Sequence, residues 1–299
     1  MLPRPFFPLL LPLTLTITAC SDGGDVSWDF DTDTPADTSA APAKPQLFEV
    51  PYAGEKRLAA DLEIGLGEVR LGRAASGQLV QAEIALSKAG LEPEFSYVPE
   101  GDGGRVAISM AGEGTLRGGK NRWDLRLTDA VPLALTVELG MSNAQLDLSG
   151  FRLTALSVEA GMAEATLRFD RPNPETLETV DISAGMAEFK ALGLGHARFR
   201  RLDFEGGAGR FVLDFRGDAL LPGAVADLEL GMASAEVILP AGRPVIIEAE
   251  EGWGSEIDVP IGFVKRGEGV WHSPEAASPA EALTIHTEVG AGSVRFRVE

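Results

Sequence analysis

The chain has 299 residues, with 45 Asp and Glu against 26 Lys and Arg, and its formal net charge is −19 at pH 7. This acidic balance argues against nucleic acid as a partner and against a polybasic patch for an anionic membrane surface. The 35 glycines and the short alternating runs of Val, Ile and Leu predict strands joined by tight turns, with few helices.

Residues 1–19 have the layout of a signal peptide. Arg4 precedes an apolar run over residues 6–19, which is too short to span a bilayer as a mature helix. The run ends in ITAC, which resembles the lipobox of bacterial lipoproteins, and Cys20 is the only cysteine in the chain. We therefore predict lipidation at Cys20 and, because Ser21 follows it, an outer-membrane location facing the periplasm or the cell surface. Ordinary signal cleavage beside an unrelated cysteine is the alternative.

Residues 20–46 predict a disordered acidic linker, because Asp, Thr, Ser, Ala and Pro dominate and aliphatic residues are few. Residues 47–131 predict an N-terminal β cap. One segment over 57–71 resembles the later repeats, and the runs 79–86, 94–98 and 105–110 predict antiparallel strands with glycine-rich joins.

Residues 132–240 predict a regular β-solenoid. Positions three and one before a repeated glycine, and four and six after it, are mostly apolar, and the residue two after it is small. The alternation indicates strands with one buried face, and its change of phase at the glycine indicates a corner. Coils of about 21–24 residues would then stack, as parallel strands do. The structural turn glycines are Gly65, Gly140, Gly161, Gly185, Gly207, Gly231 and Gly290.

The residue after the glycine is often methionine: Met141, Met162, Met186 and Met232. Leu and Ala occupy the same position in other repeats and cannot bind a metal, and no Cys or His column lies beside it. We therefore interpret these methionines as filling an irregular corner of the core, which suits an unbranched, adaptable side chain. A thioether ladder for a soft ion such as Cu(I) is the alternative.

Glutamate recurs two residues before the glycine, and its parity predicts exposure to solvent. The simplest interpretation is a charged surface that keeps the sheet from aggregating. The alternatives are a cation or polyamine site, or a docking face for a basic partner, and Ser183 interrupts the row. The candidate residues for such an interaction or cation face are Glu138, Glu159, Glu205 and Glu229.

Residues 241–299 predict C-terminal strands and a cap, joined by a polar loop over 265–282. Trp271 in that loop is predicted to pack on the last coil, with sugar stacking as the alternative. His196, His272 and His286 have no H-x-x-x-H spacing, so we predict no metal, no cofactor and no catalytic residue.

Two stretches carry a family resemblance. Residues 131–169, VPLALTVELGMSNAQLDLSGFRLTALSVEAGMAEATLRF, resemble the bacterial toast-rack envelope domains, and residues 269–298 are similar to the C-terminal domain of LiaF-like cell-envelope stress proteins. The resemblance covers roughly residues 50–299. It implies a right-handed parallel β-helix outside the cytoplasm, without enzymatic activity, that senses or signals through protein contacts. LiaF-like proteins have transmembrane helices before this domain, whereas here we expect only the lipid anchor.

Taken with that resemblance, the residues predict a non-enzymatic cell-envelope lipoprotein that acts as a protein-interaction or envelope-stress module. Two partners are expected: the membrane, which the lipid anchor enters, and another protein of the envelope. A cation- or glycan-binding protein that uses the glutamate column is the alternative, and a carbohydrate-active β-helix enzyme is the least favoured.

Overall fold

The computed structural model describes residues 44–87, 91–111, 121–252 and 254–299. All of them lie in one compact unit, Ser39–Glu299. The predicted signal peptide, Cys20 and the linker as far as residue 43 lie outside the described residues. Within the described ranges, no helix is both long and apolar enough to cross a membrane.

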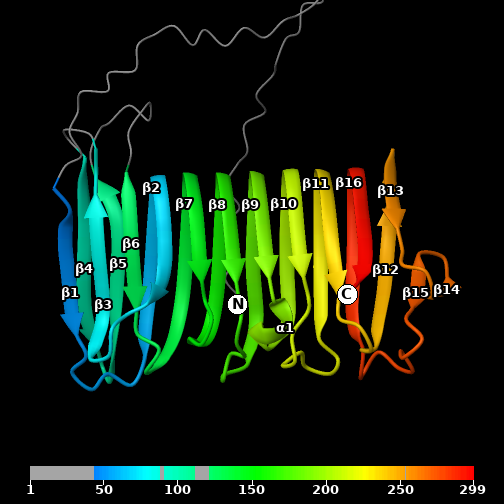
Figure 1. Cartoon of the computed structure of the whole chain (residues 1–299), viewed down its shortest axis with the longest axis horizontal. Helices are drawn as coiled ribbons and strands as arrows, with labels where there is room; N and C mark the ends of the chain where they lie inside the picture. Colours follow the sequence, from blue (N-terminus) through cyan, green and yellow to red (C-terminus); the bar gives the residue numbers. More distant parts are fainter. Residues whose placement is uncertain (1–43, 88–90, 112–120, 253) are drawn as a thin grey trace, which may run out of the picture. The chain divides into compact units, whose positions relative to one another are not determined.

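The protein is all-β, as predicted, and most of its strands pair in parallel within one sheet (Figure 1). The elements in chain order are β1 (Gln46–Pro51), β2 (Leu58–Arg73), β3 (Gln78–Ala85), β4 (Glu92–Glu100), β5 (Gly103–Ala111), β6 (Arg122–Leu127), β7 (Pro132–Asp147), β8 (Arg152–Arg168), β9 (Leu177–Leu192), α1 (Leu194–Ala197), β10 (Phe199–Asp214), β11 (Val225–Leu239), β12 (Val245–Glu251), β13 (Ser255–Asp258), β14 (Val264–Gly267), β15 (Val270–His272) and β16 (Leu283–Val298).

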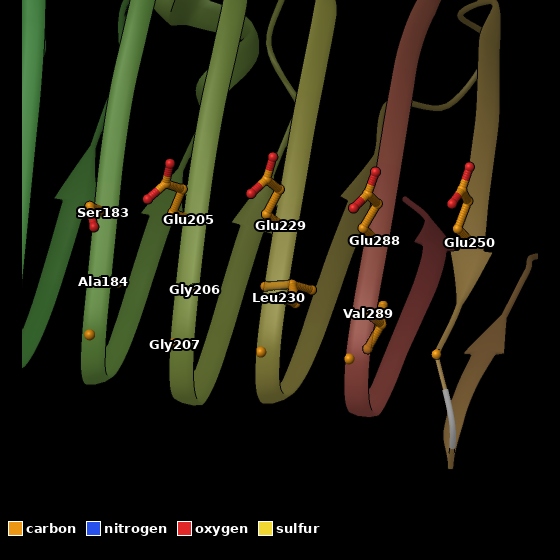
Figure 2. Close-up of a pocket in the computed structure, with 14 residues that line it drawn as sticks. Ser183, Ala184, Glu205, Gly206, Gly207, Glu229, Leu230, Glu250, Glu288 and Val289 are labelled. Carbon is orange, nitrogen blue, oxygen red and sulfur yellow. The ribbon is translucent and has the colours of Figure 1, made fainter. Parts of the chain in front are cut away.

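Seven long strands (β2, β7–β11 and β16) bend at the repeated glycine, so each consists of a first leg before the bend and a second leg after it. Figure 2 shows this bend beyond Ala184 of β9, Gly206 of β10, Leu230 of β11 and Val289 of β16. In β7, Val137 and Leu139 before the bend and Leu146 after it are buried, whereas Glu138 is exposed. The two legs enclose the core between them. In β10, for example, the rings of Phe204 and Phe211 come from opposite legs and meet edge to face at 5.3 Å.

Residues that occupy the same position relative to the repeated glycine pair with one another in adjacent strands of the sheet. The long strands pair in parallel in the order β2-β7-β8-β9-β10-β11-β16. Val137 pairs with Val158, and Val158 with Ile182, so that apolar residues lie on apolar residues from strand to strand. The predicted alternation, its change of phase and the stacking of like residues are therefore confirmed.

The two legs have separate neighbours at each end of this series. Beyond β2, its first leg pairs with β5, and β5 pairs with β4. Its second leg pairs with β6, β6 pairs with β3, and β3 pairs with β1. The runs 79–86, 94–98 and 105–110 correspond to β3, β4 and β5, and β4 and β5 pair antiparallel as expected. However, β5 also pairs with β2 in parallel, which was not predicted.

At the other end, the last strand of the chain lies inside the sheet. The first leg of β16 lies between β11 and β12, while its second leg pairs with β11 and β13. Gly252 stands between β12 and β13, so these two strands are the legs of a further repeat that the glycine spacing did not reveal. Between β9 and β10, residues Leu194–Ala197 form the four-residue helix α1.

Candidate functional site

The predicted glutamates form one exposed column on the outside of the first legs. Glu138 pairs with Glu63 and Glu159, and Glu229 pairs with Glu205 and Glu288. Ser183 of β9 interrupts the column between Glu159 and Glu205. Because paired strands lie about 4.8 Å apart, the carboxylates follow one another closely along the sheet. We call Glu63, Glu138, Glu159, Glu205, Glu229, Glu288 and Glu250 the glutamate column.

Glu250 belongs to this column although sequence reasoning missed it. It pairs with Glu288 across β12 and β16. The signal was present in the sequence, since Glu250 stands two residues before Gly252, as the other glutamates do before their glycines. It was overlooked because no apolar pattern like that of the other repeats follows Gly252.

A second acidic column lies beside the first, two residues earlier in each strand, and sequence reasoning missed it as well. Its register runs from Asp181 through Asp203 and Asp227 to His286 and Glu248. Asp181 therefore supplies a carboxylate on the strand where Ser183 breaks the glutamate column. Together, the two columns over β9–β12 and β16 form what we call the acidic face: Asp181, Asp203, Asp227, Glu248, Glu205, Glu229, Glu250 and Glu288.

Few cations neutralise the acidic face. The Arg201 guanidinium lies 2.8 Å from a carboxylate oxygen of Asp203 and 2.5 Å from one of Asp227. His286 Nδ1 lies 3.1 Å from a carboxylate oxygen of Glu248. Burial raises the pKa of the half-buried Asp227 carboxyl, although Arg201 and His286 act in the opposite direction. Among the ion pairs between described residues, none includes a member of the glutamate column.

The second legs have a different charge pattern. Several of their outward carboxylates pair with basic neighbours: Glu68 with Arg70 at 2.7 Å and Glu188 with Lys190 at 2.8 Å. In the same way, Glu236 pairs with an arginine of β16 at 2.6 Å. Glu164 instead accepts a hydrogen bond from the Asn143 side-chain amide at 3.1 Å. The negative charge that is left without a partner is thus concentrated on one side of the bent sheet.

The acidic face is hollowed near its C-terminal end. Glu205, Glu229, Glu250 and Glu288 lie in a row above the bends and project to the same side (Figure 2). They line an open groove of about 620 Å³, and a second hollow of about 380 Å³ adjoins it around His286. The carboxylates are spread along this surface. Within the described part of the chain, no three His, Cys, Asp or Glu side chains converge on a point where a metal ion could bind.

The exposure of the methionines at the bends contradicts our interpretation that they fill a corner of the core. Met162, Met186 and Met232 are 52%, 64% and 72% exposed, and Met141 is half-buried. They lie along an open apolar groove of about 860 Å³ on the outside of the bends. The interior at the corner is instead closed by the small residue two places after the glycine, such as the buried Ala163. We call Met141, Met162, Met186 and Met232 the methionine row.

Trp271 of β15 is half-buried and packs against the core, in keeping with its predicted position at the end of the sheet. The ammonium group of Lys265 lies 5.2 Å from the centre of its ring. This cation–π contact covers one face of the indole, which leaves less of the ring for stacking on a sugar.

The chain matches the family model of the N-terminal domain of toast_rack, DUF2154, over residues 37–192. No curated protein matches the chain. Among solved structures, a "putative cell adhesion protein" from Clostridium sporogenes is 18% identical, with a TM-score of 0.46, 87% of this chain and 100% of that chain being covered. A "putative adhesin" from Bacteroides fragilis is 9% identical, with a TM-score of 0.37 and coverage of 85% and 97%. Likenesses of this strength carry no binding property over to this chain.

Proposed function

The chain belongs to the toast_rack N-terminal domain family, DUF2154, and from this premise we propose that it is a non-enzymatic module of the bacterial cell envelope. In this proposal, a lipid on Cys20 holds the chain at the outer membrane, and the acidic face docks a basic segment of another envelope protein. The bent sheet is proposed to be a right-handed solenoid, in which the strands beyond β2 and beyond β16 act as caps.

The observation that carries the proposal is the difference in charge between the two legs. A surface that only prevented aggregation could have its carboxylates paired with cations on both sides, as Glu68, Glu188 and Glu236 are on the second legs. On the first legs, glutamates without an ion-pair partner instead lie directly opposite one another in adjacent strands, which destabilises a sheet. The opposed pair Glu164–Glu188 on the second legs differs, because Lys190 lies beside Glu188. A basic partner would relieve this repulsion, and the same field would accelerate its association.

A partner with several positive charges fits the geometry better than a single bound ion does. The carboxylates form two lines across five strands, β9–β12 and β16, rather than one cluster. A Lys- or Arg-rich segment could therefore contact successive glutamates. The groove between Glu205, Glu229, Glu250 and Glu288 supports a second candidate, a polyamine or a divalent cation.

The test is mild crosslinking of the membrane-associated, full-length chain, followed by purification. A variant with Glu205, Glu229, Glu250 and Glu288 changed to Gln should lose a specific protein partner that the unchanged chain retains. The matched control changes Glu68, Glu164, Glu188 and Glu236 of the second legs to Gln. It removes the same number of charges from the other side of the sheet and should retain the partner. Equal retention by both variants, or equal loss, contradicts docking on the acidic face.

The second candidate is separated from the first by thermal unfolding of the purified chain with spermidine or CaCl₂. A bound ligand raises the unfolding temperature, because it stabilises only the folded state. A rise that the four-glutamate variant abolishes, without any crosslinked protein, would favour the ligand over the protein partner.

The anchor is tested by Cys20→Ala. Each methylene of a bound acyl chain contributes about 0.8 kcal/mol to membrane affinity, so loss of the lipid should release the chain into the soluble fraction. Fractionation of cells that express the variant measures this. A variant that stays in the membrane fraction would show that something other than a lipid on Cys20 holds the chain there.

A further inference from the structure

Methionine is concentrated at the bends of this protein. The chain has 6 methionines, and four of them, the methionine row, directly follow a bend glycine. A fifth, Met110 of β5, reaches the same region: its methyl carbon lies 3.5 Å from the point that a Cβ on Gly65 would occupy. Only Met1, outside the described residues, lies elsewhere in the sequence. Large apolar side chains that stay exposed in such a pattern call for an explanation beyond packing.

Three members of the methionine row lie on consecutive strands at one level. Met141 pairs with Met162 across β7 and β8. On the next strand, the pairs Ala160–Ala184 and Glu164–Glu188 on either side place Met162 opposite Met186. Met232 is separated from them, because its neighbours in register are Ala208 and Ala291. The row therefore contains one group of three thioethers and one isolated thioether.

The spacing of these strands suits a shared ion. Two sulfurs bound to one first-row metal ion at about 2.3 Å each can lie up to about 4.6 Å apart. That distance is close to the separation of paired strands, about 4.8 Å. A methionine side chain has three rotatable bonds, so the two outer sulfurs can converge on an ion held above the central Met162.

The surroundings select the kind of ion. The groove along the methionine row is lined by Gly, Ala and Met, with no carboxylate or imidazole that would attract a hard or borderline ion. A thioether is neutral and soft, which favours Cu(I) and Ag(I) over Ca²⁺, Mg²⁺ or Zn²⁺. Glu138 and Glu159, three residues before Met141 and Met162, add a negative potential that attracts cations to this edge.

We propose that Met141, Met162 and Met186 form a binding site for a soft monovalent cation of the Cu(I) class. Leu66, Ala208 and Ala291 occupy the corresponding positions of three other long strands, so a continuous thioether ladder is excluded and a discrete site of three ligands remains. This site is independent of the acidic face and of the proposed docking function. Its ligands belong to β7, β8 and β9.

The test is a titration of the full-length chain carrying Cys20→Ala, which removes the one thiol that would bind Ag(I) more tightly than a thioether. The chain is labelled with ¹³C at the methionine methyl groups and titrated with silver nitrate in chloride-free buffer. Ag(I) serves as a redox-stable probe for Cu(I). The methyl resonances of Met141, Met162 and Met186 should shift together and saturate at one ion per chain, while that of Met232 stays in place. Absence of any shift, or an equal shift at Met232, overturns the proposal, since the latter would show unspecific binding to exposed thioethers.

Two variants sharpen the result. Met162→Leu removes the central sulfur but keeps an apolar side chain of similar size, and it should weaken Ag(I) binding by about tenfold or more, as loss of metal-site residues commonly does. Met232→Leu makes the same change at the isolated position and should leave the affinity within about twofold. Circular dichroism verifies that both variants fold. Unchanged binding by Met162→Leu also overturns the proposal.

Discussion

At the scale of single residues, the bends depend on how closely neighbouring backbones approach. A Cβ at Gly140 would overlap the carbonyl oxygen of Gly65 on the preceding strand, whereas a Cβ at Gly161 would lie 3.4 Å from the carbonyl oxygen of Leu139. The same column of the sequence thus contains glycines that the bend requires and glycines that it tolerates. Their spacing alone does not distinguish the two kinds.

This difference predicts unequal effects of alanine. Gly140→Ala should destabilise the protein by about 1–3 kcal/mol, because the backbone must shift to remove the overlap. Gly161→Ala should leave the stability unchanged or raise it by up to about 1 kcal/mol, since its added contact is ordinary and the lost freedom of the unfolded chain favours folding. Urea unfolding of the two variants measures both values. Equal destabilisation would show that the bend tolerates no side chain at either position.

The methionines show where residue patterns stop being informative. Period-two alternation correctly predicted burial on both legs, because each side of the bend follows one strand phase. At the bend the phase changes, and both the glycine and the residue after it face outward. Met162, at 52% exposure, therefore lies outside the core although its neighbours Ala160 and Ala163 are buried. Hydrophobicity suggested the opposite, and only the geometry of the corner decides it.

At the scale of elements, neighbouring strands compensate for each other's irregularities. Gly206 occupies an apolar column of β10, and a Cβ there would meet the Phe211 ring at 2.5 Å and Leu230 at 2.8 Å. The ring fills the space that the missing side chain leaves.

Asn173 stabilises the loop before β9 in another way. Its side chain is 2% exposed, accepts a hydrogen bond from the Leu153 amide and donates one to the Leu153 carbonyl, both at 2.9 Å. Such contacts depend on which segments meet across the fold.

The strand order sets the limit of prediction at this scale. The repeats that follow one another at 21–24 residues pair in sequence order, so their register could be read from the glycines. β16 follows β11 only after a gap of more than forty residues, and its first leg is inserted between β11 and β12. A local pattern cannot reveal such an insertion, because β12 carries the same apolar alternation as its neighbours. The other glutamates of the glutamate column were predicted, but the continuation of the column to Glu250 depends on this insertion.

At the scale of the whole sheet, each long strand is stabilised mainly by the strands on either side of it. Solenoids of this kind lose stability locally, and a perturbation spreads to neighbouring repeats first. The position of β16 therefore has a consequence for the C-terminal region. β12 and β13 both depend on β16 for parallel pairing, although they precede it in the chain.

Two matched substitutions should separate the ends of the sheet. Val294 of β16 and Val69 of β2 occupy the same column and are both fully buried. Changing either to alanine removes the same two methyl groups and should cost roughly 1–3 kcal/mol. In hydrogen exchange, Val294→Ala should reduce protection in β11, β12 and β13, whose residues pair with β16, and leave β6 and β7 unchanged. Val69→Ala should do the reverse, because Val69 pairs with Trp123 and Ala144. If both variants lowered protection evenly in every strand, the sheet would unfold as one cooperative unit, and the insertion of β16 would have no local effect on stability.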